Sequence, residues 1–422
     1  MALAGVVLAG LAIVLGTPSR GSFMVPAGVD SFPGWLAGPL AGRAAPLRSS
    51  GYSLLFIAMT LSYGGVIACA RELRARWVIG AIVAAHALFA LAPPLFSGDV
   101  FGYLAYARLG ALSGFDPYLV PPEAVPTDPV MPFVRWRYLP SPYGPLWTMF
   151  SYPLAPLGVA AGLWTLKALA AAASLALVAL VRASARRLGR PAVPAAALVG
   201  LNPVLLVWGV GGAHNDLLVM AVVVGGVYLL IAGREASAAG AVVAAAALKA
   251  SAGLALPFLI LGARRRGRAL AGAVGAAVLL ILVSLLGFGF DGLAGYLSVL
   301  ERQAGFVSRH SVPNEVGKLL GLGGTTPAGL RVAVTPAIRV ASVALVLGVL
   351  AWQLRRAWRG GDWIEAATWS VTALLVSATF LLPWYLIWLL PLAALAARRG
   401  PAVAALSLTA FVVVTRTPLL LA

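Results

Sequence analysis

The chain has 422 residues, of which 61% are hydrophobic and only 10% are charged, with a mean hydropathy of +0.94. This composition excludes a soluble globular domain, because apolar runs of about 17–20 residues recur along the chain and match the length of membrane spans. The runs consist of Leu, Ala and Val without strict alternation, which favours helices over β-barrel strands. We predict an all-α polytopic membrane protein with a single domain over residues 1–422.

The formal net charge is +18, from 31 Lys and Arg against 13 Asp and Glu. The basic residues gather in very short loops, so the positive-inside rule places these loops in the cytoplasm. This placement predicts contact with anionic lipid headgroups and argues against a nucleic-acid partner. The clusters are Arg71, Arg74 and Arg76; Arg182, Arg186, Arg187 and Arg190; Arg264, Arg265, Arg266 and Arg268; Arg355, Arg356 and Arg359; Arg398 and Arg399. Most acids fall in the opposite loops: Asp30, Asp99, Asp116, Glu123, Asp128, Asp216, Asp291, Glu301 and Glu315.

The apolar runs define the expected spans in chain order. They cover residues 1–16, 52–70, 77–95, 158–181, 192–209, 216–232, 269–287, 337–354, 363–382, 384–397 and 401–420. Two shorter runs, 236–248 and 252–262, predict a re-entrant or thinned hairpin with Lys249 near its turn, because each is too short for a comfortable crossing. The total is about thirteen transmembrane or re-entrant helices. Three long outer loops remain, 17–50, 96–150 and 288–336, and outer loops of this size usually have a task.

Asp99 is the first candidate for chemistry. It follows Ser97 and Gly98 at the outer end of an apolar span, where a carboxylate is costly unless the protein uses it. The alternative is that Asp99 caps a helix over residues 100–112. Tyr103, in the same run, is a candidate for substrate binding.

Several cations are candidate phosphate contacts. Arg135 and Arg137 lie in the proline- and aromatic-rich second loop together with Tyr143, and a guanidinium group binds phosphate oxygens in a bidentate manner; the alternative is that these arginines snorkel at the lipid surface. Lys249 lies in the apolar hairpin, where a cation usually faces a cavity and a partner; the alternative is a lysine that snorkels at the rim of the membrane. Arg309 and His310, in the third loop, are further candidates.

The triplet His214-Asn215-Asp216 opens the span 216–232 from the outer side. A helix N-terminus with three polar groups can hold a sugar or an anion; the alternative is that Asn215 or Asp216 simply caps that helix. Trp384 and Tyr385 follow Pro383 where two late spans meet, and they are candidates for substrate binding. The alternative is that they belong to an interfacial aromatic belt. The sequence lacks an Asp-x-Asp motif, a Gly-x-x-x-x-Gly-Lys loop and a Cys/His cluster, so we expect no metal and no other cofactor.

Four motifs occur in a recognisable order: Ser97-Gly98-Asp99-Val100 with Tyr103, Gly114-Phe115-Asp116-Pro117-Tyr118, Pro142-Tyr143-Gly144-Pro145-Leu146-Trp147, and Gly212-Ala213-His214-Asn215-Asp216. Together they resemble the polyprenol-phosphomannose-dependent α-1,6-mannosyltransferases of the C-type glycosyltransferase superfamily. The resemblance implies a C-type helical bundle in the cell membrane. It also implies transfer of mannose from a polyprenyl-phosphate donor to a hydroxyl of an envelope glycan or glycolipid on the outer face, with inversion and with Asp99 as catalytic base.

The residues fit this chemistry. An inverting transfer needs one carboxylate beside the acceptor hydroxyl, and that carboxylate takes the proton as the oxygen attacks. A phosphate leaving group departs as an anion and needs cations rather than a general acid. A transporter or flippase for a lipid-linked sugar is the alternative, because it would use the same cations without forming a bond.

Overall fold

The structure is a computed structural model that describes residues 1–17, 22–26, 29, 32–43, 47–325 and 331–417. Asp30 and the end of the last expected span lie outside the described residues. The helices are α1 (Ala2–Leu15), α2 (Gly34–Ala37), α3 (Ser49–Cys69), α4 (Ala75–Leu91), α5 (Asp99–Ala111), α6 (Pro145–Ser151), α7 (Gly158–Arg187), α8 (Ala192–Gly200), α9 (Asp216–Ile231), α10 (Glu235–Leu248), α11 (Leu256–Gly262), α12 (Arg266–Ala304), α13 (Val312–Leu319), α14 (Pro336–Trp358), α15 (Trp363–Ser377), α16 (Leu386–Leu395) and α17 (Arg399–Arg416). Two short strands, β1 (Gly324–Thr325) and β2 (Arg331–Val332), pair antiparallel with Gly324 opposite Val332.

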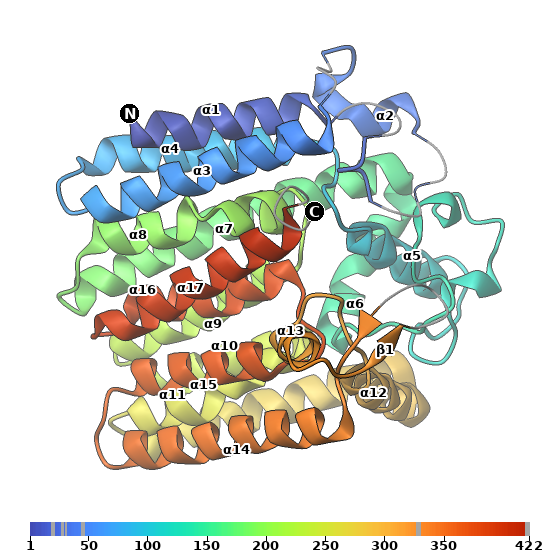
Figure 1. Ribbon diagram of the computed structural model, residues 1–422. Coiled ribbons are helices and arrows are strands. Elements are labelled where there is room, and N and C mark those ends of the chain that lie inside the picture. The colour runs from blue at the N-terminus through green and yellow to red at the C-terminus, as the bar shows by residue number, and fades with distance from the viewer. Residues whose placement is uncertain (18–21, 27–28, 30–31, 44–46, 326–330, 418–422) are drawn as a thin grey trace.

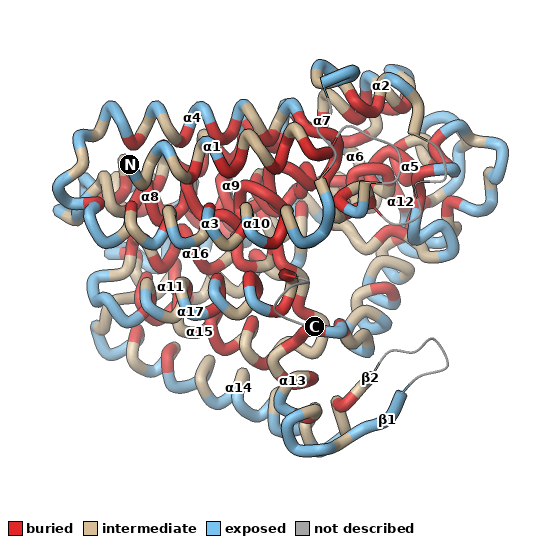
Figure 2. The backbone as a smooth tube through the Cα atoms, turned by 45° about the horizontal axis from the view of Figure 1, so that its top comes forward, coloured by how far each residue is buried: buried red, intermediate tan, exposed pale blue. Residues whose placement is uncertain are grey.

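The long helices lie side by side as a bundle (Figure 1). Helix α7 packs against α4, α8 and α9, while α16 packs against α8, α9, α15 and α17, so α7, α8, α9 and α16 form the centre. The buried residues concentrate on the inner faces of these helices (Figure 2). The N-terminal helices α1, α3 and α4 cover one side of this centre, and α12 and α14 lie on the opposite side (Figure 1).

The two ends of the bundle differ. At one end, short turns connect α3 to α4, α7 to α8, α14 to α15 and α16 to α17, and at the other end lie α2, α5, α6, α13 and the strands (Figure 1). Ion pairs connect three of the basic turns. Arg190, in the turn between α7 and α8, lies 2.8 Å from Asp362, in the turn between α14 and α15. In addition, Arg356 and Arg398 both approach Glu365, at 3.2 and 3.9 Å. The arginine clusters of these turns therefore share one end of the bundle, as the sequence predicts.

The apolar outer surface identifies a membrane protein. Among the described residues, four helical stretches are long and apolar enough to cross a bilayer, and shorter apolar helices accompany them. The apolar windows of α12 and α14 are only 17% and 6% buried inside the protein, so lipid is the natural solvent for their exposed side chains. Thirteen crossings and a C-type bundle remain predictions.

The boundaries of several elements differ from the prediction. The first part of the third loop, predicted over residues 288–336, is helical, because α12 continues to Ala304 after a change of direction at Gly289, where φ is 65°. The span 192–209 is not continuous: α8 ends at Gly200, and a separate π-helical turn covers Leu205–Val210. Pro203 cannot donate a backbone hydrogen bond, and Asn202 Oδ1 instead accepts from the amides of Val204 and Leu205.

The short hairpin is confirmed as two helical segments. Helix α10 ends at Leu248, a 3-10 helix covers Ala250–Ala255, and α11 follows. Lys249 lies between them in an extended backbone conformation. Its side chain thus emerges at the end of the bundle that carries α5, α6 and α13.

Candidate active site

A cavity of about 590 Å³ opens at the end of the bundle opposite the basic turns. Its lining comes from the start of α5, the second long loop, the turn after α10, the end of α12, the segment before α16 and the end of α17. Seven of the predicted site residues line it: Asp99, Arg135, Tyr143, Lys249, Arg309, Trp384 and Tyr385. Residues that lie almost 300 positions apart in the sequence therefore meet around one cavity.

Asp99 is the first residue of α5, and Gly98 rather than Asp99 occupies the N-cap position of this helix. The side chain is 17% exposed. Burial raises the pKa of this carboxyl group from 3.8 to about 6, the positive charge of Lys249 lowers it, and the negative charge of Asp216 raises it further. Among the described residues that line the cavity, Asp99 is the only acid. It can therefore accept a proton near neutral pH.

His214 lies directly behind Asp99. Its imidazole stacks on Trp384 with ring centroids 3.8 Å apart, and its Nδ1 lies 3.7 Å from Asp99 Oδ2. Burial, reinforced by Lys249, holds the pKa of His214 well below its ordinary value, so the ring is neutral. The preceding residue, Ala213, has a positive φ of 55°, which is uncommon for a residue with a side chain. A strained turn thus places a neutral ring between the carboxylate and the indole.

Asp216 and Lys249 form a charged pair beside the cavity. Lys249 Nζ lies 2.7 Å from Asp216 Oδ1, and the indole of Trp388 donates to the same oxygen at 2.6 Å. The ammonium group also lies 5.3 Å from the ring centroids of Tyr385 and Trp388. Asn215 occupies the N-cap position of α9, but its side chain makes no capping hydrogen bond there. Asp216 is fully buried and fixes the cation that lines the cavity.

Tyr103 and Asn215 support the cavity wall from behind. The Tyr103 hydroxyl donates to the side-chain Oδ1 of Asn215 and accepts from the backbone N–H of Asn215, both at 3.3 Å. The ring of Tyr103 packs edge-on against Tyr143, 4.7 Å away. Next to Tyr143, the Gly144 amide donates to Leu248 O at 3.1 Å, and a side chain at Gly144 would collide with the backbone there. Tyr143 is therefore held against the turn that carries Lys249.

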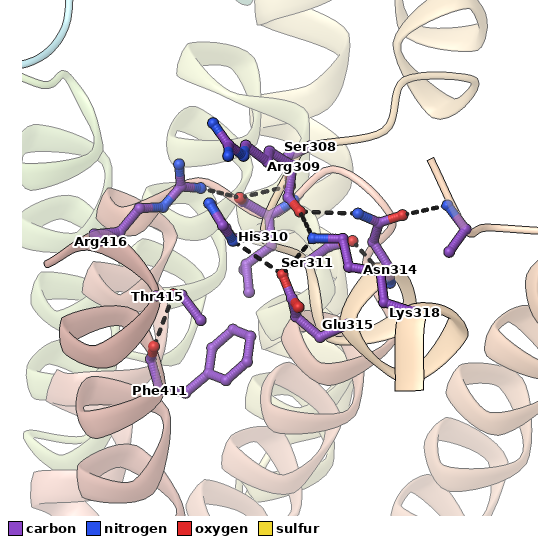
Figure 3. A network of polar contacts seen from close by, with 12 residues as sticks. Ser308, Arg309, His310, Ser311, Asn314, Glu315, Lys318, Phe411, Thr415 and Arg416 are labelled. Carbon is purple, nitrogen blue, oxygen red and sulfur yellow. Dashed lines mark hydrogen bonds and ion pairs between the residues drawn. The ribbon is translucent and has the colours of Figure 1, made fainter. Parts of the chain in front are cut away.

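Three arginines, Arg302, Arg309 and Arg416, form a cationic wall of the cavity. Helix α13 supports it, because Ser311 accepts a hydrogen bond from the amide of Asn314 at the start of this helix. The backbone carbonyl of Arg309 accepts from Asn314 Nδ2 at 2.8 Å and from Lys318 Nζ at 2.9 Å (Figure 3). These two bonds fix the backbone of Arg309.

His310 does not line the cavity. Its Nδ1 lies 2.9 Å from Glu315 Oε1, as Figure 3 shows, and Lys318 Nζ lies at the same distance from that oxygen. Burial lowers the pKa of His310, although the hydrogen bond with Glu315 opposes this. Arg137 is exposed and does not line the cavity, and its backbone carbonyl accepts from the Glu123 amide.

Sequence reasoning missed Arg302 and Arg416. The available signal was the charge pattern itself, because the basic clusters lie in the short turns and an arginine at the opposite end of a helix departs from that pattern. Arg416 ends α17, which begins in a basic turn, and Arg302 lies near the end of α12, which also begins at a basic turn. Each arginine therefore lies one helix length away from the basic turn at which its helix begins, at the opposite end of the bundle.

The family model for the α-(1→6)-mannopyranosyltransferase N-terminal domain matches residues 2–265, more than half of the chain. The chain belongs to the α-(1→6)-mannopyranosyltransferase family. A second model, the MptB C-terminal domain, matches residues 313–419. In this family member both matched parts contribute to the cavity, since Asp99 and Lys249 lie in the first and Trp384 and Arg416 in the second.

Relatives from several organisms carry the family name. An α-(1→6)-mannopyranosyltransferase A of Mycobacterium tuberculosis is 29% identical over 338 residues, covering 75% of this chain and 64% of the relative. The α-(1→6)-mannopyranosyltransferase A of Corynebacterium glutamicum is 28% identical over 333 residues, covering 70% and 66%. The chain thus spans just under two thirds of the length of these relatives. No solved structure matches it significantly.

Proposed function

We propose that this protein transfers a mannosyl residue from a polyprenyl-phosphate donor to a hydroxyl group of an envelope glycan or glycolipid, at the outer face of the cell membrane and with inversion at the anomeric carbon. One observation carries the proposal: Asp99 is the only acid among the described residues that line a cavity whose other charged lining residues are cations. The names of the relatives suggest the sugar and an α-1,6 linkage.

The reaction requires one proton transfer and one displacement. The acceptor oxygen attacks the anomeric carbon, its proton passes to Asp99, and the bond between that carbon and the phosphate oxygen breaks with its electron pair going to the phosphate. The raised pKa of Asp99, about 6, suits a base that must be ionised at neutral pH yet take a proton in the transition state. The neutral ring of His214, 3.7 Å away, leaves the negative charge of Asp99 intact.

The leaving phosphate needs positive charge. We assign it to the cationic wall of Arg302, Arg309 and Arg416, because Arg309 and Arg416 lie close enough for their like charges to repel. An anion between guanidinium groups relieves this repulsion and gains charge-assisted hydrogen bonds. Beside the same wall, Val299, Phe306 and Phe380 give the cavity an apolar side, which suits the first isoprene units of a lipid donor.

The decisive experiment incubates purified protein with polyprenyl-phosphate-mannose and an oligomannoside acceptor. Wild type should lengthen the acceptor by one hexose in a new linkage of inverted configuration, measured by mass spectrometry and NMR. Asp99→Asn should lower turnover by about 10³-fold, the middle of the range of about 10²- to 10⁴-fold for general-base catalysis. Donor binding should remain. The matched control is Asp291→Asn, an exposed acid outside the cavity, which should retain activity.

Two outcomes would contradict the proposal. Normal turnover by Asp99→Asn would remove this carboxylate from the mechanism. Movement of the donor across liposomes by the wild type, without a new glycosidic bond, would identify a transporter of lipid-linked sugars instead.

A further inference from the structure

Two further cavities lie far from the candidate active site, at the basic end of the bundle. The larger one, about 550 Å³, lies between α14 and α15 and reaches the start of α17. The smaller one, about 520 Å³, lies beside the turn after α14. The two cavities share Trp352 and Arg356. We propose that together they bind one anionic phospholipid, with an acyl chain in the larger cavity and the phosphate headgroup at the arginines of its basic end.

The shape of the larger cavity suits an acyl chain. Helix α14 contributes Leu345, Val349, Trp352 and Arg356, which are three or four residues apart and so share one helix face. Helix α15 runs in the opposite direction and contributes Glu365, Trp369, Ala373 and Val376 at the same spacing. From residue 345 to residue 356 a helix rises about 16 Å, which is close to the thickness of one leaflet, about half of a 30 Å hydrocarbon core. The cavity therefore follows the path of a single lipid tail.

The charge at the basic end suits a phosphate. Arg356 and Arg398 both approach Glu365, so one acid faces two cations. The adjoining cavity adds Arg355 and Arg359, both exposed. The mouth of the site therefore keeps a net positive charge after its internal ion pairs are formed, and an anionic headgroup at the membrane surface would neutralise it.

An unsatisfied polar group inside the cavity points to a ligand independently. Gln353 is 1% exposed and lines the larger cavity. Its Oε1 has no hydrogen-bond partner among the described residues, and a buried acceptor without a donor is costly. A hydroxyl group of a glycerol headgroup could supply the missing donor.

Helix α14 has little protein packed against it. Its apolar window is only 6% buried, and most of its length appears exposed or intermediate in Figure 2. It packs mainly on α15, with further contacts to α11 and α13. A lipid seated between α14, α15 and α17 would therefore add packing where the protein has little of its own.

The test is a lipid titration of the detergent-solubilised full chain, followed by thermal unfolding and native mass spectrometry. Phosphatidylglycerol should raise the melting temperature and remain bound as a one-to-one adduct, whereas phosphatidylcholine and inorganic phosphate should do neither. The double variant Arg355→Gln/Arg359→Gln should weaken phosphatidylglycerol binding by about 30-fold, the equivalent of about 1 kcal/mol for each cation near an anionic surface. Val349→Trp, which fills the tail cavity, should abolish the adduct.

The matched control is Arg71→Gln/Arg74→Gln, which removes two exposed arginines from a different basic turn and should bind lipid like the wild type. Equal loss of binding in the control would overturn the site, because it would mean that the overall charge of the basic end attracts the lipid. Equal stabilisation by phosphatidylcholine, or by inorganic phosphate, would overturn it as well.

Discussion

The ammonium group of Lys249 lies 2.7 Å from Asp216 Oδ1 and joins the turn after α10 to the first residue of α9 at the wall of the cavity. Asp216 is fully buried, and its second oxygen has no hydrogen-bond partner among the described residues. The pair therefore combines a structural contact with a cation that lines the cavity.

The first prediction separates these two roles. Lys249→Met should destabilise the protein by about 3–5 kcal/mol, because it leaves a buried carboxylate without its partner. Lys249→Met/Asp216→Asn removes both charges and should recover most of that stability. Transfer activity should stay low in both variants, since the cation at the cavity is missing from each. Full activity in the double variant would mean that Lys249 serves only to neutralise Asp216.

The second prediction concerns pH. A general base must be ionised, and burial raises the pKa of Asp99 to about 6. The rate constant kcat/KM should therefore rise about tenfold per pH unit below pH 6 and level off above it. The donor is a phosphodiester that stays ionised throughout this range. The acid limb should persist in His214→Phe, because His214 is already neutral there, and its disappearance in that variant would assign the limb to the imidazole.

The third prediction concerns stability. The pKa of Asp99 is higher in the folded protein than its ordinary value of 3.8, so the folded state favours the protonated form. The stability that this preference contributes is present below pH 4 and is lost as the pH rises through about 6. Asp99→Asn should therefore raise the free energy of unfolding near pH 7 by up to about 3 kcal/mol, seen as a higher melting temperature. Asp291→Asn should not do so, and an equal gain there would exclude the explanation.

The fourth prediction tests Arg416, which ends α17 and lines the cavity. Arg416→Gln should raise the KM for the polyprenyl-phosphate donor by about tenfold to a hundredfold, the equivalent of one charge-assisted hydrogen bond. The KM for the acceptor should change little. Arg234→Gln, an exposed arginine between α9 and α10, is the matched control. An unchanged donor KM in Arg416→Gln would place the phosphate elsewhere.

The fifth prediction fixes the orientation in the membrane. Cys69 is the only cysteine of the chain; it is exposed and lies at the end of α3 beside a basic turn. Glu123 is exposed in the loop on the cavity side. In intact cells, a membrane-impermeant maleimide should label Glu123→Cys but not Cys69, and both should react after permeabilisation. Labelling of Cys69 alone in intact cells would reverse the proposed orientation.

The sequence predicts the helices well because each one has an apolar composition that only lipid or a core can accommodate. It does not predict where a single residue changes the backbone, as at Gly289 and at Pro203. Asp99 and Lys249 were found because a charge in an apolar context is costly. The stacking of His214 on Trp384 could not be predicted, since it depends on two helices whose packing no local pattern specifies.

The same limit explains the cationic wall. Arg302 and Arg416 are more than one hundred positions apart and reach one cavity only because the ends of α12 and α17 both lie at it. Their distance from the basic turns is visible in the sequence, but their convergence is not. Arg137, in contrast, matched a phosphate-binding pattern and lies outside the cavity lining.

One glycine in α12 determines where part of this wall stands. At Gly289 the backbone adopts a φ of 65°, open to glycine and unfavourable for residues with a Cβ atom, and nothing else crowds the position. A methyl group at this position would meet no neighbour. It would nevertheless favour a straight helix and so move Arg302 from its observed position. Gly289 thus influences the position of the Arg302 guanidinium group in the cavity that Asp99 also lines, without contacting either residue.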